Sequence, residues 1–243
     1  MQLHYGYHNV KELKEKRGFV RAFDRLKKEG LVKHLSLSQH SYAGSSRLDN
    51  GESAAKILRA VADDGLYEYA QFIYSYGGDD EMDEFMAYAK KKRFGTIAMK
   101  TARGLGRMKQ DKAFMDSVPG GAAPHNALMR WLTTETDLDA VVMRVRNLEE
   151  FSESYAGAGK RMRSNDKETI EKMSRRAKTT ACRLCADCQS HCPQKVEIAD
   201  ILRFERYAMD DHDWHEANSL YAQLPVKADA CRACGTCIEH CPL

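Results

Sequence analysis

The sequence has 243 residues, 43% of them hydrophobic and 30% charged, and its formal net charge at pH 7 is +3. This length suits one large domain or two smaller ones with a buried core. The small net charge, without a basic run interleaved with aromatic residues, argues against a nucleic-acid surface. No stretch approaches the roughly eighteen apolar residues of a membrane span, and nothing at the N-terminus resembles a secretory signal. We therefore expect no nucleic-acid or membrane partner, and a cytoplasmic location.

Short apolar runs alternate with amphipathic segments over the first two thirds of the chain. The apolar runs predict strands at Gln2–Tyr5, Leu31–Ser38, Ala70–Tyr74, Gly95–Lys100 and Leu138–Arg144. The amphipathic segments predict helices at Gly18–Glu29, Ser53–Asp64, Glu81–Lys92, Asn126–Thr134 and Leu148–Ala156, with a glycine-rich loop at Gly104–Gly121. This alternation predicts a parallel sheet covered by helices. Because no Gly-x-Gly-x-x-Gly follows the first strand, part of a (β/α)8 barrel is favoured over a doubly wound sheet.

The cysteines form two copies of one pattern near the C-terminus. The first copy consists of Cys182, Cys185, Cys188 and Cys192, and the second of Cys231, Cys234, Cys237 and Cys241, with a proline after each fourth cysteine. This spacing is the ligand pattern of bacterial two-cluster ferredoxins, in which the fourth cysteine ligates the other cluster. By that pattern, Cys241 would complete the ligand set of the first triplet, and Cys192 that of the second.

Zinc and disulfides are the competing interpretations of the cysteines. Structural zinc usually takes two cysteine pairs from separate hairpins, which a third cysteine at the same short spacing does not match. Disulfides need an oxidising compartment, which a cytoplasmic protein does not meet. The pattern therefore favours two [4Fe–4S] clusters as cofactors, with zinc as the alternative.

The balance of charge changes sign toward the C-terminus. Residues 155–181 hold eight basic and three acidic residues, whereas residues 182–243 hold six basic and ten acidic ones. The basic part includes a predicted helix at Asn165–Thr180, and further amphipathic helices are predicted at Ile198–Met209 and Asp213–Tyr221. The basic helix either offsets the charge of the anionic clusters or is an ordinary solvated helix face.

Five sequence runs resemble one enzyme family. They are LHYGYHN, LKKEGLVKHLSLSQHS, AQFIYSY, TIAMKTARGLG and VVMRVRNLEEF. In this order they resemble the second half of the aldo/keto reductase barrel, in the branch with a C-terminal pair of [4Fe–4S] motifs. The resemblance implies an α/β fold: a partial TIM barrel of about five parallel strands, followed by a mainly α-helical two-cluster domain. The boundaries are then 1–160 for the barrel part, 161–181 for a basic connecting helix and 182–243 for the ferredoxin-like domain.

The resemblance also implies a nicotinamide site at the C-terminal ends of the strands. His4 matches the family's histidine that helps to bind the substrate carbonyl, although a structural histidine is the alternative. Ser38 and Gln39 stand where the family places a Ser-Asn pair against the nicotinamide carboxamide. Gln71 stands where the family has a glutamine beneath the ring.

Two further positions match the cofactor site less cleanly. Tyr76 is a candidate for stacking on the ring, and Lys100 lies in the family's phosphate-side loop. A packed aromatic side chain and a solvated lysine are the respective alternatives. Near Asn147 and Glu149 the chain lacks the Lys-Ser pair of NADP-specific members, so the resemblance implies NADP or NAD without deciding between them.

The family's acid–base residues have no match in this chain. They are a tyrosine, a lysine and an aspartate on earlier strands, and none of Tyr5, Tyr7 or Lys11 matches their motifs. We therefore expect either a fragment of a longer enzyme or a protein that has lost the reaction.

The expected full-length activity follows from the resemblance. It is hydride exchange with a small-molecule carbonyl or alcohol, coupled to electron transfer through the clusters to a redox partner protein. The alternatives are a non-catalytic electron-transfer or assembly module, and a zinc-bound interaction domain.

Overall fold

The computed structural model describes the chain except residues 5, 40–51, 78–79, 122, 146, 181, 183, 185, 211 and 242–243, and the side chains of 121 and 178–180. The strands are β1 (Gln2–Leu3), β2 (Ser36–Gln39), β3 (Tyr69–Ile73), β4 (Gly95–Met99) and β5 (Ala140–Val141). The helices before the connecting segment are α1 (Val10–Glu15), α2 (Gly18–Lys28), α3 (Ala54–Asp64), α4 (Asp80–Lys92), α5 (Leu105–Gln110), α6 (Lys112–Ser117), η1 (Pro119–Gly121), α7 (Pro124–Thr134) and α8 (Leu148–Gly157). The remaining helices are α9 (Ser164–Thr180), α10 (Asp187–Ser190), α11 (Ile198–Met209), α12 (Trp214–Ala222), η2 (Ala228–Ala230) and α13 (Thr236–Glu239).

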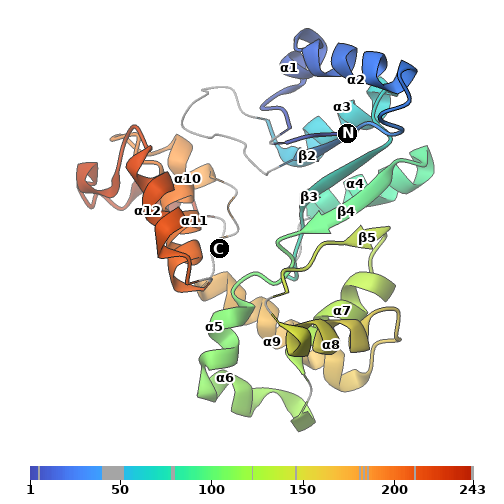
Figure 1. The fold of residues 1–243 in the computed structure, drawn as a ribbon. Helices are drawn as coiled ribbons and strands as arrows, with labels where there is room; N and C mark the ends of the chain where they lie inside the picture. The colour runs from blue at the N-terminus through green and yellow to red at the C-terminus, as the bar shows by residue number, and fades with distance from the viewer. Residues whose placement is uncertain are drawn as a thin grey trace.

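The five strands form one parallel sheet in the order β1-β2-β3-β4-β5 (Figure 1). A doubly wound sheet reverses its strand order at a switch point, whereas a (β/α)8 barrel adds each strand beside the previous one. Since parallel crossovers are right-handed, crossovers that all advance in one direction place their helices on one face of the sheet. The predicted fold class, a partial barrel of five parallel strands, is therefore confirmed, and β1 pairs with β2 as expected.

The register of the sheet aligns the residues that face the helices. Leu37 of β2 is opposite Ala70 of β3, and Phe72 of β3 is opposite Ala98 of β4; all four are fully buried. Phe72 meets Phe85 of α4 edge to face, with ring centroids 5.6 Å apart. The alternate residues of β3 point to the opposite face and are only half-buried. The main core therefore lies between the sheet and its helices.

Capping residues set both ends of α3. The Ser53 side chain accepts a hydrogen bond from the backbone N–H of Lys56 and caps the helix, and Gly65 ends it with a φ of 72°. Ile57, Leu58 and Val61 form the buried stripe.

The predicted strand Leu31–Ser38 is wrong in its first half. Gly30 has a φ of 74°, its N–H bonds to the carbonyl of Lys27, and the N–H of Leu31 bonds to that of Leu26. This is the Schellman arrangement, which ends α2 and keeps Leu31 hydrogen-bonded to the last turn of the helix. Leu31 is accordingly 69% exposed, and the strand begins only at Ser36.

The predicted glycine-rich loop at Gly104–Gly121 is also wrong, because it contains α5 and α6. Gly104, with a φ of 69°, turns the chain into α5, and Leu105 and Met108 bury one side of that helix. The Asp111 side chain then caps α6 by accepting from the N–H of Phe114 at 3.2 Å. The helical spacing of the apolar residues prevails over the glycine content.

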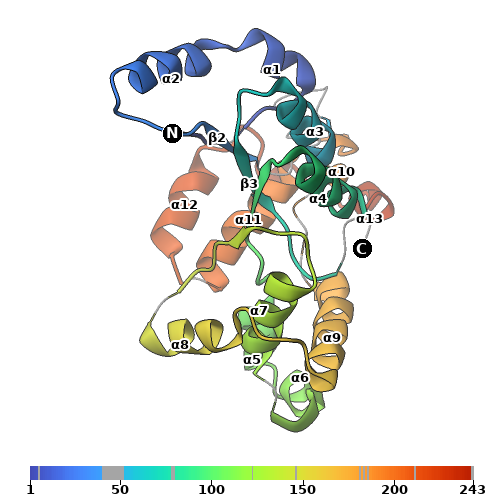
Figure 2. The same cartoon turned by 90° about the vertical axis from the view of Figure 1, so that its right-hand side faces the viewer.

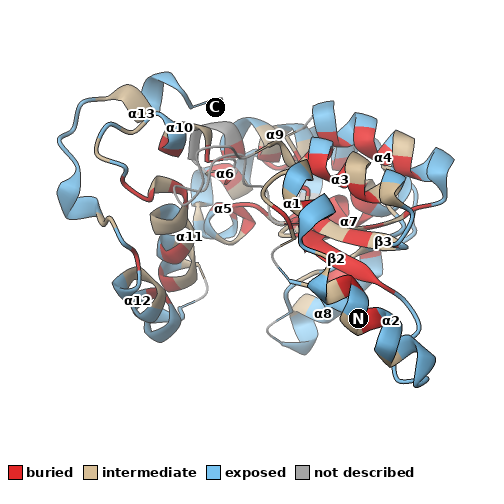
Figure 3. Cartoon of the chain, turned by 90° about the horizontal axis from the view of Figure 1, so that it is seen from above, coloured by how far each residue is buried: buried red, intermediate tan, exposed pale blue. Residues whose placement is uncertain are grey.

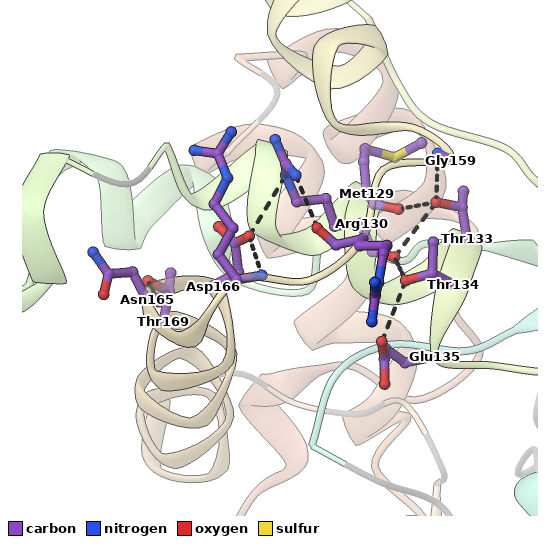
Figure 4. A network of polar contacts seen from close by, with 11 residues as sticks. Met129, Arg130, Thr133, Thr134, Glu135, Gly159, Asn165, Asp166 and Thr169 are labelled. Carbon is purple, nitrogen blue, oxygen red and sulfur yellow. Dashed lines mark hydrogen bonds and ion pairs between the residues drawn. The ribbon is translucent and has the colours of Figure 1, made fainter.

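The connecting helix α9 is anchored to α7 by a polar network (Figure 4). The Arg130 guanidinium donates to the carbonyl of Arg161 at 2.9 Å, and its Nε lies 3.5 Å from the Asp166 carboxylate. The same carboxylate accepts from the backbone N–H of Arg163 at 2.9 Å, just before α9. Both charged side chains are less than a tenth exposed, so their pairing fixes where α9 begins. Helices α7, α8 and α9 pack together at one end of the sheet (Figure 2).

The C-terminal helices α10 to α13 form a separate group beside the sheet (Figure 1). Helices α11 and α12 pack as a pair around Phe204, Ala208, Ala217 and Leu224. Seen from above, buried residues concentrate in the sheet and its helices, whereas the C-terminal group is mostly exposed (Figure 3). None of the described helices is long and apolar enough to cross a membrane.

Candidate metal centre and adjoining cavity

The two cysteine motifs share one backbone conformation. Leu184 and Ala233, two residues after the first cysteine of each copy, have φ angles of 59° and 53°. Their backbone N–H groups donate to the sulfurs of Cys182 and Cys231 at 3.3 Å and 3.4 Å. Positive φ is uncommon for these residue types, so its recurrence at equivalent positions shows that the repeat is structural as well as sequential.

The repeat continues through the short helices α10 and α13. Ala186 and Gly235 precede these helices in the left-handed conformation, with φ angles of 63° and 82°. The N–H of Cys192 then donates to the carbonyl of Gln189, and the N–H of Cys241 to that of Ile238, both at 3.2 Å. Each fourth cysteine is therefore held by the last turn of its own short helix.

The two copies meet at their ends. His191 and His240, each directly before a fourth cysteine, stack with ring centroids 3.6 Å apart and an interplanar angle of 9°. Helices α10 and α13 are also in contact. Burial raises the pKa of the Cys182 thiol, and Cys241 of the other copy lies close enough to raise it further. Cys241 of the second copy therefore lies within electrostatic range of Cys182 of the first.

The donor chemistry of the described cysteines matches iron–sulfur clusters. Seven of the described cysteines form no disulfide: Cys182, Cys188, Cys192, Cys231, Cys234, Cys237 and Cys241. Cys185 lies outside the described residues. No three described His, Cys, Asp or Glu side chains are already gathered at metal-binding spacing. The fit to two clusters therefore rests on the thiol donor set, the duplicated backbone and the contact between the two copies.

A cavity of about 610 Å³ lies at the C-terminal ends of the strands, between the sheet and α11. We call the part of the chain before α9, which holds the sheet and helices α1 to α8, the sheet region. Its residues that line the cavity are Gln71, Met99, Lys100, Thr101, Ala102, Gly104, Gly106, Lys109, Gln110, His125, Val142, Met143, Arg144 and Glu150. From the C-terminal part it is lined by Leu184, Arg203, Arg206, Tyr207 and Asp210. Because Leu184 is two residues from Cys182, the cavity adjoins the first cysteine motif.

Lys100 is a buried charged group in the lining of the cavity. Its amine is buried and has no hydrogen-bond partner among the described residues. Burial lowers the pKa of Lys100 to about 8, and the nearby guanidinium groups of Arg203 and Arg206 lower it as well.

Ion pairs hold α11 against α5 at the edge of the cavity. The Arg107 guanidinium donates to the carboxylates of Glu205 at 2.8 Å and Asp210 at 2.6 Å. These carboxylates raise the pKa of Arg107. The C-terminal part is thereby connected to α5, the helix that follows β4.

Of the predicted nicotinamide contacts, Gln71 and Lys100 line the cavity. The Gln71 amide donates to the sulfur of Met99 at 3.3 Å, on the half-buried face of the sheet. Both assignments stay predictions. The alternative interpretation, that Lys100 is an ordinary solvated lysine, does not agree with its buried amine.

The other predicted contacts do not line the cavity. The Gln39 side-chain amide forms two hydrogen bonds with the backbone of Tyr7. It accepts from the Tyr7 N–H at 3.1 Å and donates to the Tyr7 carbonyl at 2.8 Å. Tyr76 is fully buried and its hydroxyl donates to the carbonyl of Arg103, which agrees with a packed aromatic side chain. Ser38 is buried beside Met99, and His4 is exposed beyond β1. Their cofactor and substrate roles stay predictions.

Sequence reasoning missed Arg203 and Arg206 as cavity residues. They lie one turn apart on α11, whose limits Ile198–Met209 were predicted correctly. Their spacing indicated a common helix face, but nothing in the sequence indicated that this face turns toward strands more than 100 residues earlier.

The comparisons with known proteins agree with the cysteine motifs. Residues 174–242 match the family model described as a 4Fe-4S dicluster domain. The C-terminal part of the chain is therefore a dicluster domain, as predicted, and such a domain indicates electron transfer. The comparison with curated proteins found no match.

Among solved structures, the chain is similar to "aldo-keto reductase AKR11C1 from Bacillus halodurans (apo form)". The sequence identity is 13% and the TM-score 0.47, over 71% of this chain and 60% of that chain. The chain thus spans less than two thirds of the length of that protein.

Proposed function

We propose that the chain is an iron–sulfur oxidoreductase component in which the two copies of the motif exchange their fourth cysteine. Cys182, Cys185, Cys188 and Cys241 would hold one [4Fe–4S] cluster, and Cys231, Cys234, Cys237 and Cys192 the other. The stacking of His191 on His240, with ring centroids 3.6 Å apart, supports this exchange because these residues directly precede the two fourth cysteines. When bound, the clusters supply one-electron transfer.

The cavity supports a nicotinamide dinucleotide, NADP or NAD, as the second cofactor. Its volume lies within the usual range of small-molecule sites, and it combines apolar residues such as Met99 and Val142 with several cations. Gln71 would orient the ring and Lys100 would bind a phosphate. When bound, the nicotinamide supplies hydride transfer to or from a small-molecule carbonyl or alcohol.

The position of the cavity carries the proposal. Leu184 belongs both to the cavity lining and to the first cysteine motif. Arg206, which also lines the cavity, lies close enough to Cys182 to oppose the rise in the pKa of its thiol. A redox ligand in the cavity would therefore be next to the residues that hold the first cluster, an arrangement that suits electron exchange with a redox partner protein.

One observation favours the alternative of a non-catalytic electron-transfer or assembly module. Gln39 and Tyr76 are engaged in packing, and His4 is exposed. In that case the sheet would serve only as a scaffold for the dicluster domain.

Two measurements test these proposals. Anaerobic reconstitution with iron and sulfide should give a brown protein with about eight iron atoms per chain, bleached by dithionite. A colourless protein that binds zinc stoichiometrically would contradict the cluster assignment. NADPH and NADH are then titrated into the reconstituted protein. Quenching of their fluorescence supports the nicotinamide site, and its absence supports the module.

A further inference from the structure

The cavity between the sheet and the dicluster domain carries an excess of positive charge. Its cationic side chains are Lys100, Lys109, Arg144, Arg203 and Arg206, and its carboxylates are Glu150 and Asp210. Two of these cations belong to the dicluster domain and the others to the sheet region. Cations from two parts of a chain that line one cavity favour the binding of an anion in it.

The amine of Lys100 is the strongest observation in favour of an anionic ligand in the cavity. It is buried and unpartnered among the described residues, although a buried ammonium group normally has an acceptor. Burial lowers the pKa of Lys100, and repulsion by Arg203 and Arg206 adds to the effect, which Asp200 only partly opposes. An anion placed between these groups would supply the missing acceptor and relieve the repulsion.

The arginines are held in position by carboxylates of their own helix region. Arg203 pairs with Asp200 at 2.6 Å, and the Nε of Arg206 lies 3.8 Å from the Asp210 carboxylate. These pairs restrict the arginine side chains while both still line the cavity. A guanidinium group fixed in this way is suited to the two-point binding of phosphate oxygens.

We propose that Arg203 and Arg206 of the dicluster domain act with Lys100 as an anion clamp for a diphosphate-bearing ligand. The site is thus composite, and is complete only when α11 is docked against the sheet region. This inference deepens the proposed function, on which it rests for its use of the same cavity. It adds that the dicluster domain itself contributes to ligand recognition.

The test is calorimetric titration of the reconstituted protein with inorganic pyrophosphate as the probe. We expect saturable binding by the unaltered chain, weakened about 10- to 100-fold by Arg203→Gln and by Arg206→Gln, because each removes a charge-assisted hydrogen bond. Lys100→Met should weaken binding to a similar degree. Arg175→Gln is the matched control, since it removes the same charge from an exposed position on α9 and should leave binding unchanged.

Iron content and the visible spectrum of each variant show whether the dicluster domain is intact. The clamp is overturned if pyrophosphate does not bind the intact protein, if malonate binds more tightly than pyrophosphate, or if the arginine variants with full iron content bind pyrophosphate normally. A parallel titration with NADPH separates the two proposals. If pyrophosphate binds and NADPH does not, the clamp is supported and the nicotinamide assignment is contradicted. If NADPH binds equally well to the arginine variants, the nicotinamide assignment is supported and the clamp is contradicted.

Discussion

The sheet region and the dicluster domain are stabilised in different ways. The core of the sheet region runs continuously through β2, β3, β4, α3, α4 and α7 and reaches Met173 of α9. The dicluster domain has a much smaller described core: Phe204, Ala208, Ala217 and Leu224 form one cluster, and Leu184, Ala186, Val196 and Ala199 are also buried. Apolar burial explains the first region, but a core of this size rarely stabilises a domain without metal or disulfide cross-links. We therefore expect cluster ligation to supply the stability that this small core does not.

Removal of the clusters should produce the largest effect. Because ligand binding and folding are coupled in small metal-binding domains, the apo protein should lose the order of α11 and α12 while α3 and α4 remain folded. Hydrogen exchange of the reconstituted and the iron-depleted protein checks this expectation. Amides of α11 that stay equally protected without iron would show that the small core suffices.

A substitution in the core of the sheet region should instead destabilise that region. Phe72 is fully buried and contacts Phe85, so Phe72→Ala should destabilise the sheet region by about 3–5 kcal/mol. Urea unfolding followed by far-UV circular dichroism measures this change. The matched control is Leu31→Ala, which alters a side chain that is 69% exposed and should cost less than about 0.5 kcal/mol. Similar effects of the two substitutions would contradict the assigned core.

Lys100 lies where the two regions meet, and its replacement should stabilise the ligand-free protein. Its pKa falls from 10.5 to about 8 on folding, so at pH 7 the buried charge costs roughly 3 kcal/mol. Below pH 8 lysine is charged in both states and the cost is fully present. The cost decreases between pH 8 and 10.5, because the folded state releases its proton first.

Anaerobic urea titrations of Lys100→Met and the unaltered chain at several pH values test this expectation. The variant should be the more stable by the largest margin at pH 7, and the margin should shrink toward pH 10. A margin that grows with pH would mean that the Lys100 amine is not desolvated.

The smallest effect is expected at the ion pairs between the regions. Arg107 is 41% exposed, so Arg107→Gln should change global stability by less than about 1 kcal/mol. It should nevertheless increase hydrogen exchange in α11, which it connects to α5 through Glu205 and Asp210. Arg59→Gln, which breaks the exposed pair with Glu84 inside the sheet region, is the control and should leave α11 unchanged.

The sequence predicted those features that depend on neighbouring residues. The limits of α11 were correct, and α3 ends at Asp64 as predicted. The parallel sheet followed from the alternation of apolar runs and helices, and the dicluster domain from the cysteine spacing. Each of these signals depends on residues that are close together in the sequence.

The features that were not predicted depend on contacts between distant segments. Leu31 is apolar like a strand residue, but the Schellman turn at Gly30 leaves it outside the sheet. The cavity could not be inferred, because Lys100 and Arg206 are brought together only by the docking of α11. The packing of Gln39 against Tyr7 likewise required the fold, since its amide suited the nicotinamide site equally well in sequence.

The exchange of the fourth cysteine between the two motifs is tested most directly by cysteine alkylation of the variant Cys241→Ala. After anaerobic reconstitution, iodoacetamide labelling and mass spectrometry identify the cysteines that no cluster protects. Loss of Cys241 should expose Cys182, Cys185 and Cys188 to the reagent, while Cys231, Cys234 and Cys237 stay protected. Labelling of Cys231, Cys234 and Cys237 instead would show that each motif holds its cluster alone, and would contradict the exchange.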